Sequence, residues 1–123
     1  MIQRPKNLNL LTIHFPLPAI VSILHRISGL VLFILTPFVL WVWGLSISVP
    51  EVFDHIQYIL QSFFVKGIIW LLLLPFCYHF VAGIRHLFLD IHIGEELRSG
   101  RITAIYTLFI TAVLAVLIGV WLW

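Results

Sequence analysis

Three long apolar stretches dominate the chain, and the segments between them hold most of the charged residues. They run from about Ile27 to Leu45, from Phe63 to Ile84 and from Ile102 to Trp123. Each approaches the ~20 residues that an α-helix needs to cross a bilayer core, and each is too apolar for an amphipathic surface helix. Because backbone groups in lipid must be satisfied within their own segment, we expect helices rather than strands.

The pattern therefore predicts an all-α integral membrane protein with three transmembrane helices, preceded by a short cytoplasmic segment. It forms a single membrane-anchor domain over residues 1–123. The predicted helices cover roughly residues 22–45, 63–89 and 102–123. Pro37 interrupts the first helix and Pro75 the second, where a proline either kinks the helix or is merely accommodated by its packing.

Composition supports lipid as the surrounding medium. Of 123 residues, 62% are hydrophobic and 10% are charged, and the mean hydropathy is +1.13. Soluble domains are about half apolar and about a quarter charged, and so short a chain has little interior in which to bury the excess. The net charge of +2 does not indicate nucleic acid binding. The single cysteine, Cys77, lies in an apolar run and is expected to be a small buried hydrophobe, and covalent c-type haem attachment is excluded.

The basic residues predict the orientation of the helices. Six of the seven lysines and arginines either precede or open the first helix or fall between the second and third: Arg4, Lys6, Arg26, Arg85, Arg98 and Arg101. The seventh, Lys66, lies just beyond the connection between the first two. The intervening connection, residues 46–62, holds Glu51 and Asp54 but neither lysine nor arginine. The positive-inside rule then places the N-terminus in the cytoplasm and the C-terminus in the periplasm. An aromatic belt at the outer interface is formed by Trp41, Trp43, Trp121 and Trp123.

A first group of polar residues lies at the start of the first helix. Ser22, His25, Arg26 and Gly29 are spaced so that they share one face. The serine and arginine could bind an oxygen of a ligand, and the glycine leaves room for a flat group. Alternatively, His25 and Arg26 only reach the lipid headgroups.

A second group lies near the end of the second helix. His79 and His86 are seven residues apart and so share a face, with Gly83 between them. His79 lies roughly 9 Å deeper than Arg85, and a neutral imidazole there suits an axial position on haem iron. Gly83 would let a porphyrin approach the backbone, and Arg85, His86, His25 and Arg26 would lie near its propionates. The alternative is that His79 is a hydrogen-bonded packing residue.

Other polar residues are weaker candidates for a site. His14 and His92 fall outside the spans on the cytoplasmic side, and His55 falls in the outer connection, so each is expected at an interface or in solvent. A solvated loop face that is available to a soluble partner is expected at Asp90, Glu95 and Glu96.

Taken together, the two groups resemble the cytochrome b556 subunits of bacterial succinate dehydrogenase, the larger membrane anchor of respiratory complex II. The resemblance rests on Arg4-Pro5, on Ser-Ile-Leu-His-Arg-Ile-Ser-Gly at residues 22–29, and on His-Phe-Val-Ala-Gly-Ile-Arg-His at residues 79–86, closed by Asp90. It extends over the whole chain. Lys6 and Leu89 depart from the residues that are commoner at those positions, at the margins of the signatures.

The resemblance implies a role for each residue. His79 would be one axial ligand of a haem b, and a histidine of a smaller hydrophobic anchor subunit would be the other. Ser22 and Arg26 would line a ubiquinone site, while His25, His86 and Arg85 would contact the haem propionates. Electrons would come from succinate through a flavoprotein subunit and an iron–sulfur subunit, with the whole complex held in the lipid of the bacterial inner membrane.

Other functions remain open from the sequence. A haem-free structural anchor would only tether a soluble enzyme, and a fumarate reductase-type anchor would serve the reverse reaction. A small transporter subunit is disfavoured, because the polar residues gather at one membrane face instead of forming a path across it.

Overall fold

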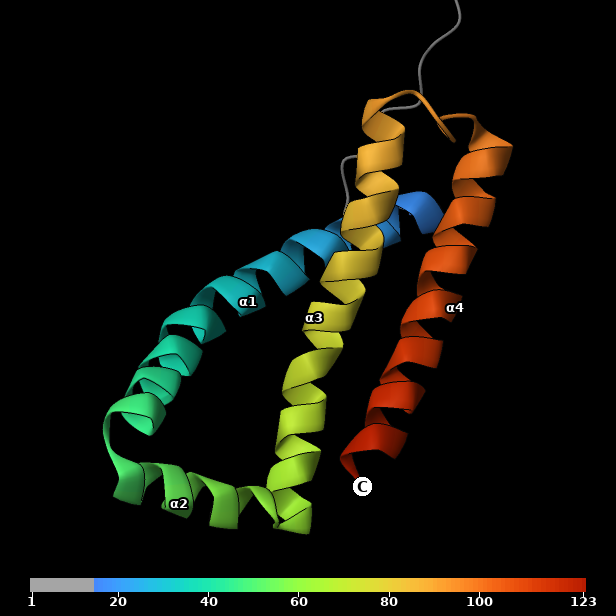
Figure 1. Cartoon of the computed structure of the whole chain (residues 1–123). Coiled ribbons are helices and arrows are strands. Elements are labelled where there is room, and N and C mark those ends of the chain that lie inside the picture. The colour runs from blue at the N-terminus through green and yellow to red at the C-terminus, as the bar shows by residue number, and fades with distance from the viewer. Residues whose placement is uncertain (1–14) are drawn as a thin grey trace, which may run out of the picture.

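The computed structural model describes residues 15–123, which form four helices (Figure 1). These are α1 (Leu17–Ser48), α2 (Pro50–Leu60), α3 (Phe63–Asp90) and α4 (Leu97–Leu122). Three of them, α1, α3 and α4, are long and apolar enough to cross a membrane, which confirms the predicted all-α fold and its three long helices. The predicted N-terminal segment, with Arg4-Pro5 and His14, lies outside the described residues.

Two helices begin earlier than the sequence predicted. α1 starts at Leu17 rather than near residue 22, because Pro18 occupies the first turn, where a proline removes no intrahelical hydrogen bond. α4 starts at Leu97 rather than near residue 102. Its first turn carries Arg98 and Arg101, so hydropathy alone placed it in the connection. Both predicted start points were therefore wrong, whereas the predicted end of α3 differs from the observed one by a single residue.

The connection between the first two spans contains a helix that hydropathy did not predict. α2 opens on Pro50 and has Glu51 in its first turn, both favourable at a helix N-terminus. Its apolar side chains, including Phe53 and Ile56, recur at helical spacing among polar ones, which is typical of a helix lying in a membrane interface. α2 runs across one end of the molecule, at the opposite end from the α3–α4 turn (Figure 1).

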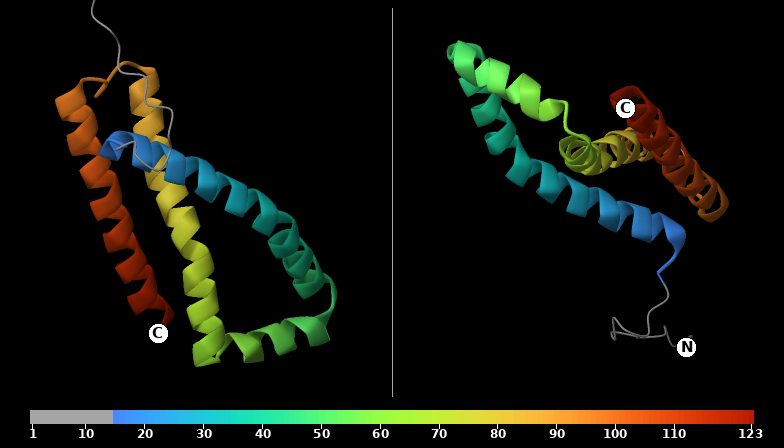
Figure 2. Two further views of the ribbon diagram at one scale, coloured as in Figure 1. Left: turned by 180° about the vertical axis from the view of Figure 1, so that it is seen from behind. Right: turned by 90° about the horizontal axis from the view of Figure 1, so that it is seen from below.

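The three long helices are arranged with α3 in the middle, between α1 and α4 (Figure 2). α4 runs alongside α3, and the indole Nε1 of Trp70 donates to the carbonyl oxygen of Ala115 at 2.8 Å. α1 crosses the C-terminal half of α3 and then diverges from it, changing direction in the half that contains Pro37 (Figures 1 and 2). α3 shows no comparable bend at Pro75 (Figure 1).

The packed interior is small and lies where α3 meets its two neighbours. Its buried apolar members are Val21, Cys77, Val81, Ala82 and Ala104, and Cys77 is thus the buried hydrophobe that the sequence predicted. Most large apolar side chains instead face outward, as expected for a chain whose surroundings are lipid. Beyond the crossing, an apolar pocket of about 610 Å³ separates α1 from α2 and α3.

Candidate functional site

Histidines from two helices lie together where α1 crosses α3. The ring of His25 on α1 stacks on the ring of His79 on α3, with centroids 4.1 Å apart and planes 16° from parallel. The centroid of His86, two turns further along α3, lies 4.8 Å from that of His25. The crossing thus joins the two polar groups of the sequence into one histidine cluster: His25, His79 and His86.

Two glycines allow the helices to approach closely at this cluster. A Cβ added to Gly29 would lie 3.0 Å from Cε1 of His79, which is closer than ordinary van der Waals contact. A Cβ added to Gly83 would lie 3.5 Å from Nε2 of His25, which is an ordinary contact. Gly29 therefore makes room for the His79 ring itself, and Gly83 lies beside His25.

The Nδ1 atom of His79 is held by oxygens of α1. Ser28 Oγ lies 3.1 Å from Nδ1, and the carbonyl oxygen of His25 lies 3.2 Å from it. The Ser28 hydroxyl also donates to that carbonyl oxygen at 2.8 Å, so toward His79 it is an acceptor. Because both neighbours accept, Nδ1 carries the ring proton and the lone pair of the neutral ring is on Nε2.

These residues fit a haem b. A histidine that ligates iron presents one bare nitrogen and donates from the other to an oxygen acceptor, as His79 does here. Two neighbouring ring nitrogens, Nε2 of His25 and Nε2 of His86, are buried and have no hydrogen-bond partner within the described residues. Buried polar atoms are rarely left unpaired, and the carboxylates of propionate groups are suitable partners.

The cluster does not form a complete metal site by itself. Within residues 15–123, no group of three or more His, Cys, Asp or Glu side chains is arranged to hold a metal ion. The rings of His25 and His79 stack face to face, so their nitrogens do not converge on one point. An iron bound by His79 would need its second axial ligand from elsewhere.

Arg85 lies apart from the histidine cluster. Its side chain, 7% exposed, turns toward α4, where Nε donates to Thr103 Oγ1 at 3.2 Å and Nη2 donates to the carbonyl oxygen of Gly100 at 3.4 Å. The hydroxyl of Tyr78, two turns earlier on α3, donates to the carbonyl oxygen of Val21 at 2.7 Å. Both side chains therefore hold α3 to its neighbouring helices near the same end of the molecule.

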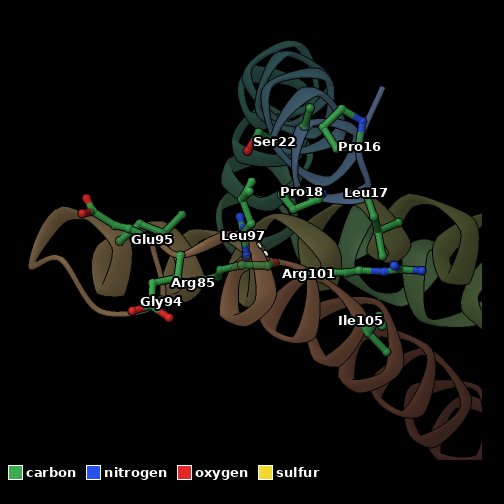
Figure 3. Close-up of a pocket in the computed structure, with 14 residues that line it drawn as sticks. Pro16, Leu17, Pro18, Ser22, Arg85, Gly94, Glu95, Leu97, Arg101 and Ile105 are labelled. Atoms are coloured by element: carbon green, nitrogen blue, oxygen red, sulfur yellow. Dashed lines mark hydrogen bonds between the residues drawn. The ribbon is translucent and has the colours of Figure 1, made fainter. Parts of the chain in front are cut away.

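A pocket of about 900 Å³ opens where the first turns of α1 and α4 meet the end of α3 (Figure 3). Ser22 and Arg85 line it from α1 and α3, and Arg101 lines it from α4. Arg26 is exposed and does not line this pocket. The structure thus places Ser22 at a pocket and Arg26 one turn further along the same helix, on the molecular surface.

The remaining predicted residues are in solvent-facing positions. His92, in the α3–α4 turn, is exposed and pairs with Glu95 at 2.9 Å between Nδ1 and Oε1. His55 lies on α2 and is exposed. Asp90 ends α3 and Glu96 precedes α4, so the acidic residues form the expected loop face.

Three residues that contribute to these contacts were not among the predicted site residues. They are Ser28 beside His79, Tyr78 on the Val21 carbonyl, and Thr103 on Arg85. Ser28 had a signal, since it is three residues after His25 and precedes Gly29. Tyr78 and Thr103 had none, because their partners lie on other helices.

Comparison with known proteins adds to this geometry. A family model described as "Succinate dehydrogenase/Fumarate reductase transmembrane subunit" matches residues 1–118. The chain is 42% identical, over 98% of both chains, to the succinate dehydrogenase cytochrome b556 subunit of Coxiella burnetii. It is 30% identical to the subunit of that name from Paracoccus denitrificans, over 94% of this chain and 88% of that one. It is also 31% identical to that of Rickettsia typhi, over 98% of this chain and 91% of that one.

Proposed function

The chain belongs to the succinate dehydrogenase/fumarate reductase transmembrane subunit family, and from that premise we propose that it binds a haem b and ubiquinone for the complex. It is a cytochrome b556-type membrane anchor subunit of succinate dehydrogenase. The observation that carries the proposal is that two oxygens of α1 lie within hydrogen-bond distance of Nδ1 of His79, which favours the tautomer with its lone pair on Nε2. The haem, when bound, supplies a one-electron carrier in the membrane.

His79 would ligate the haem iron from this chain, and the histidines around it would hold the propionates. His25 and His86 present buried nitrogens to the propionates. Gly83 keeps α3 free of a side chain beside His25. Arg26 follows His25 on α1 and is exposed, and it is close enough to offer a cation to the propionates. Arg85 is a weaker candidate for the propionates than the sequence suggested, because its Nε and Nη2 donate to α4, although its Nη1 is buried without a partner among the described residues.

The quinone site is proposed at the start of α1. The hydroxyl of Ser22 faces a pocket large enough for a quinone headgroup and can donate to a carbonyl oxygen. Arg26 lies outside the lining of this pocket, one turn further along α1, and its guanidinium is proposed to stabilise the negative charge that develops on the quinone oxygens during reduction. Reduction to the quinol takes two electrons and two protons. The electrons come from succinate through other subunits, and this chain contributes binding and charge stabilisation.

Partners and orientation follow from the same surfaces. A second hydrophobic anchor subunit, carrying the other axial histidine, is proposed on the open side of the histidine cluster. The iron–sulfur subunit covers the end of the molecule that carries the first turns of α1 and α4, and the flavoprotein subunit is attached through it. The basic residues of that end, including Arg98 and Arg101, support a position on the cytoplasmic side of the bacterial inner membrane.

The test is a reduced-minus-oxidised spectrum of the purified complex. The complex with the native chain should show a b-type band, and His79→Gly should abolish it. Added imidazole should restore the band by filling the space of the missing ring. His55→Ala, which removes an exposed histidine on α2, is the matched control and should leave the band unchanged. A full band in His79→Gly would refute the ligand assignment, and absence of any band from the native complex would favour a haem-free anchor.

A further inference from the structure

Ser28 is a buried hydroxyl beside the proposed iron ligand, at 5% exposure in the α1–α3 interface. It donates to the carbonyl oxygen of His25, three residues back on its own helix, at 2.8 Å. A serine in a helix commonly bonds its own helix in this way, so that bond alone needs no further explanation. The lone pairs of Oγ, however, face another helix, where they lie 3.1 Å from Nδ1 of His79.

We infer that Ser28 is a positioning residue that sets the tautomer and the electron-donating strength of His79. The inference rests on the proposed function, since it concerns the haem that His79 would bind. His79 Nδ1–H is bonded to Ser28 Oγ, and the Ser28 hydroxyl is bonded to the His25 carbonyl. This chain of bonds keeps the proton on Nδ1 and leaves Nε2 bare for iron.

The chain of bonds is stronger than either bond alone. Because the Ser28 hydroxyl donates to a carbonyl, its oxygen becomes a better acceptor for Nδ1–H, and the low dielectric of the interface strengthens both bonds. A stronger acceptor at Nδ1–H makes the imidazole a more basic ligand. A more basic ligand stabilises ferric over ferrous iron, so Ser28 lowers the reduction potential of the haem.

The geometry also limits rotation of the ring. The backbone of Gly29 lies against one edge of His79, with 3.0 Å between its would-be Cβ and Cε1. The ring of His25 covers one face at a centroid distance of 4.1 Å. A ring held in this way keeps Nδ1 on its two acceptor oxygens, so loss of the Ser28 oxygen weakens the hydrogen bond more than it moves the ring.

The experiment measures the midpoint potential and the low-spin EPR spectrum of the haem in the purified complex. Ser28→Ala removes one of the two acceptors at Nδ1 and leaves only the His25 carbonyl oxygen, and Ser28→Cys keeps a similar volume but offers only a weak acceptor. In both variants the ratio of ferrous to ferric haem at a given potential should rise about threefold. Because a tenfold change in this ratio corresponds to 59 mV, the midpoint potential should rise by about 30 mV. Ser28→Thr retains a hydroxyl that can bond the same carbonyl, and it should restore the native potential.

Thr36→Val is the matched control. Thr36 lies on the same helix and donates to its own helix, to the carbonyl oxygen of Leu32 at 2.7 Å, but its position is exposed. Its loss should leave the potential unchanged. If Ser28→Ala and Ser28→Cys match Thr36→Val in potential and EPR spectrum, the inference is wrong.

Loss of haem from a variant is also informative. If Ser28→Ala and Ser28→Cys lose the haem while Ser28→Thr keeps it, the hydroxyl is required for ligation and the inference stands. If Ser28→Thr loses the haem as well, Ser28 acts only through its size and the inference is overturned. Retention of haem by His79→Gly without imidazole would instead refute the proposed function, so the two failures are distinguishable.

Discussion

Replacing Gly29 with alanine should displace the His79 ring and weaken haem retention. The added Cβ would lie 3.0 Å from Cε1 of His79 and 3.5 Å from its Nδ1. Carbon atoms at optimal contact are about 3.5–4.0 Å apart, so the ring or the helix must shift by a few tenths of an ångström. The His25 ring covers one face of His79, and Nδ1 is bonded to oxygens of α1, so the ring has little freedom to retreat.

The expected free energy follows from two opposing effects. Overpacking of a well-filled interface costs about 1–3 kcal/mol. Alanine is a better helix former than glycine by about 0.5–1 kcal/mol, which offsets part of that cost. The net destabilisation of the α1–α3 crossing by Gly29→Ala is therefore about 0–2.5 kcal/mol, and near the middle of that range because the His79 ring has little room to retreat.

Gly44→Ala isolates the packing effect from the change in helix propensity. Gly44 lies on the same helix, and a Cβ added there has no neighbour within 4 Å among the described residues. The assay is haem content per complex and the thermal midpoint of the detergent-solubilised complex. Gly29→Ala should lower both, whereas Gly44→Ala should lower neither. Equal behaviour of the two variants would refute the close approach of α1 to His79.

Two further substitutions test the residues that surround the cluster. Arg26→Ala should lower kcat for quinone reduction at least tenfold while the haem band persists, with Arg98→Ala, an exposed arginine outside the pocket, as its control. Normal kinetics in Arg26→Ala would remove that residue from the quinone site. Arg85→Met should destabilise the complex by about 1–3 kcal/mol in thermal unfolding, because Thr103 and Gly100 lose their donor, yet leave the haem spectrum unchanged. A loss of haem in Arg85→Met would instead restore the propionate role that the sequence suggested.

Hydrophobic pattern was sufficient to predict the long helices, because each must cover the bilayer by itself. It failed where the helix extends into polar sequence. The first turn of α4 contains two arginines, and α2 is too short and too polar to register as a span. α2 is helical because of its proline position, its acidic first turn and its amphipathic spacing, which hydropathy does not measure.

The candidate site was predictable in its members but not in its arrangement. Helical spacing placed His79 and His86 on one face and grouped His25 with Gly29, yet it gave no relation between the two helices. That relation is set by the crossing of α1 and α3. There, Gly29 leaves space for the His79 ring, and Arg85 donates a hydrogen bond to α4. A partner on another helix leaves no local trace in the sequence, which is why Tyr78 and Thr103 were missed.

The α1–α3 crossing has to be stabilised by something other than the hydrophobic effect, since lipid solvates apolar side chains as well as another helix does. α4 is held to α3 by the Trp70 bond to Ala115 and by the bonds of Arg85. α1 touches α3 over a shorter length and then diverges (Figure 2). Its specific bonds to α3 are those from Tyr78 to Val21 and from His79 to Ser28 and the His25 carbonyl.

The contacts that hold α1 in place are therefore largely the contacts that orient the proposed iron ligand. A haem bound through His79 and paired with His25 would bridge α3 and α1 directly, adding to a crossing that has few other bonds. Haem binding and the packing of α1 against α3 are then coupled by mass action, because a ligand that binds only the packed helices stabilises their contact. The position of α1, and with it that of Ser22 and Arg26, depends on the same cluster that holds the electron carrier.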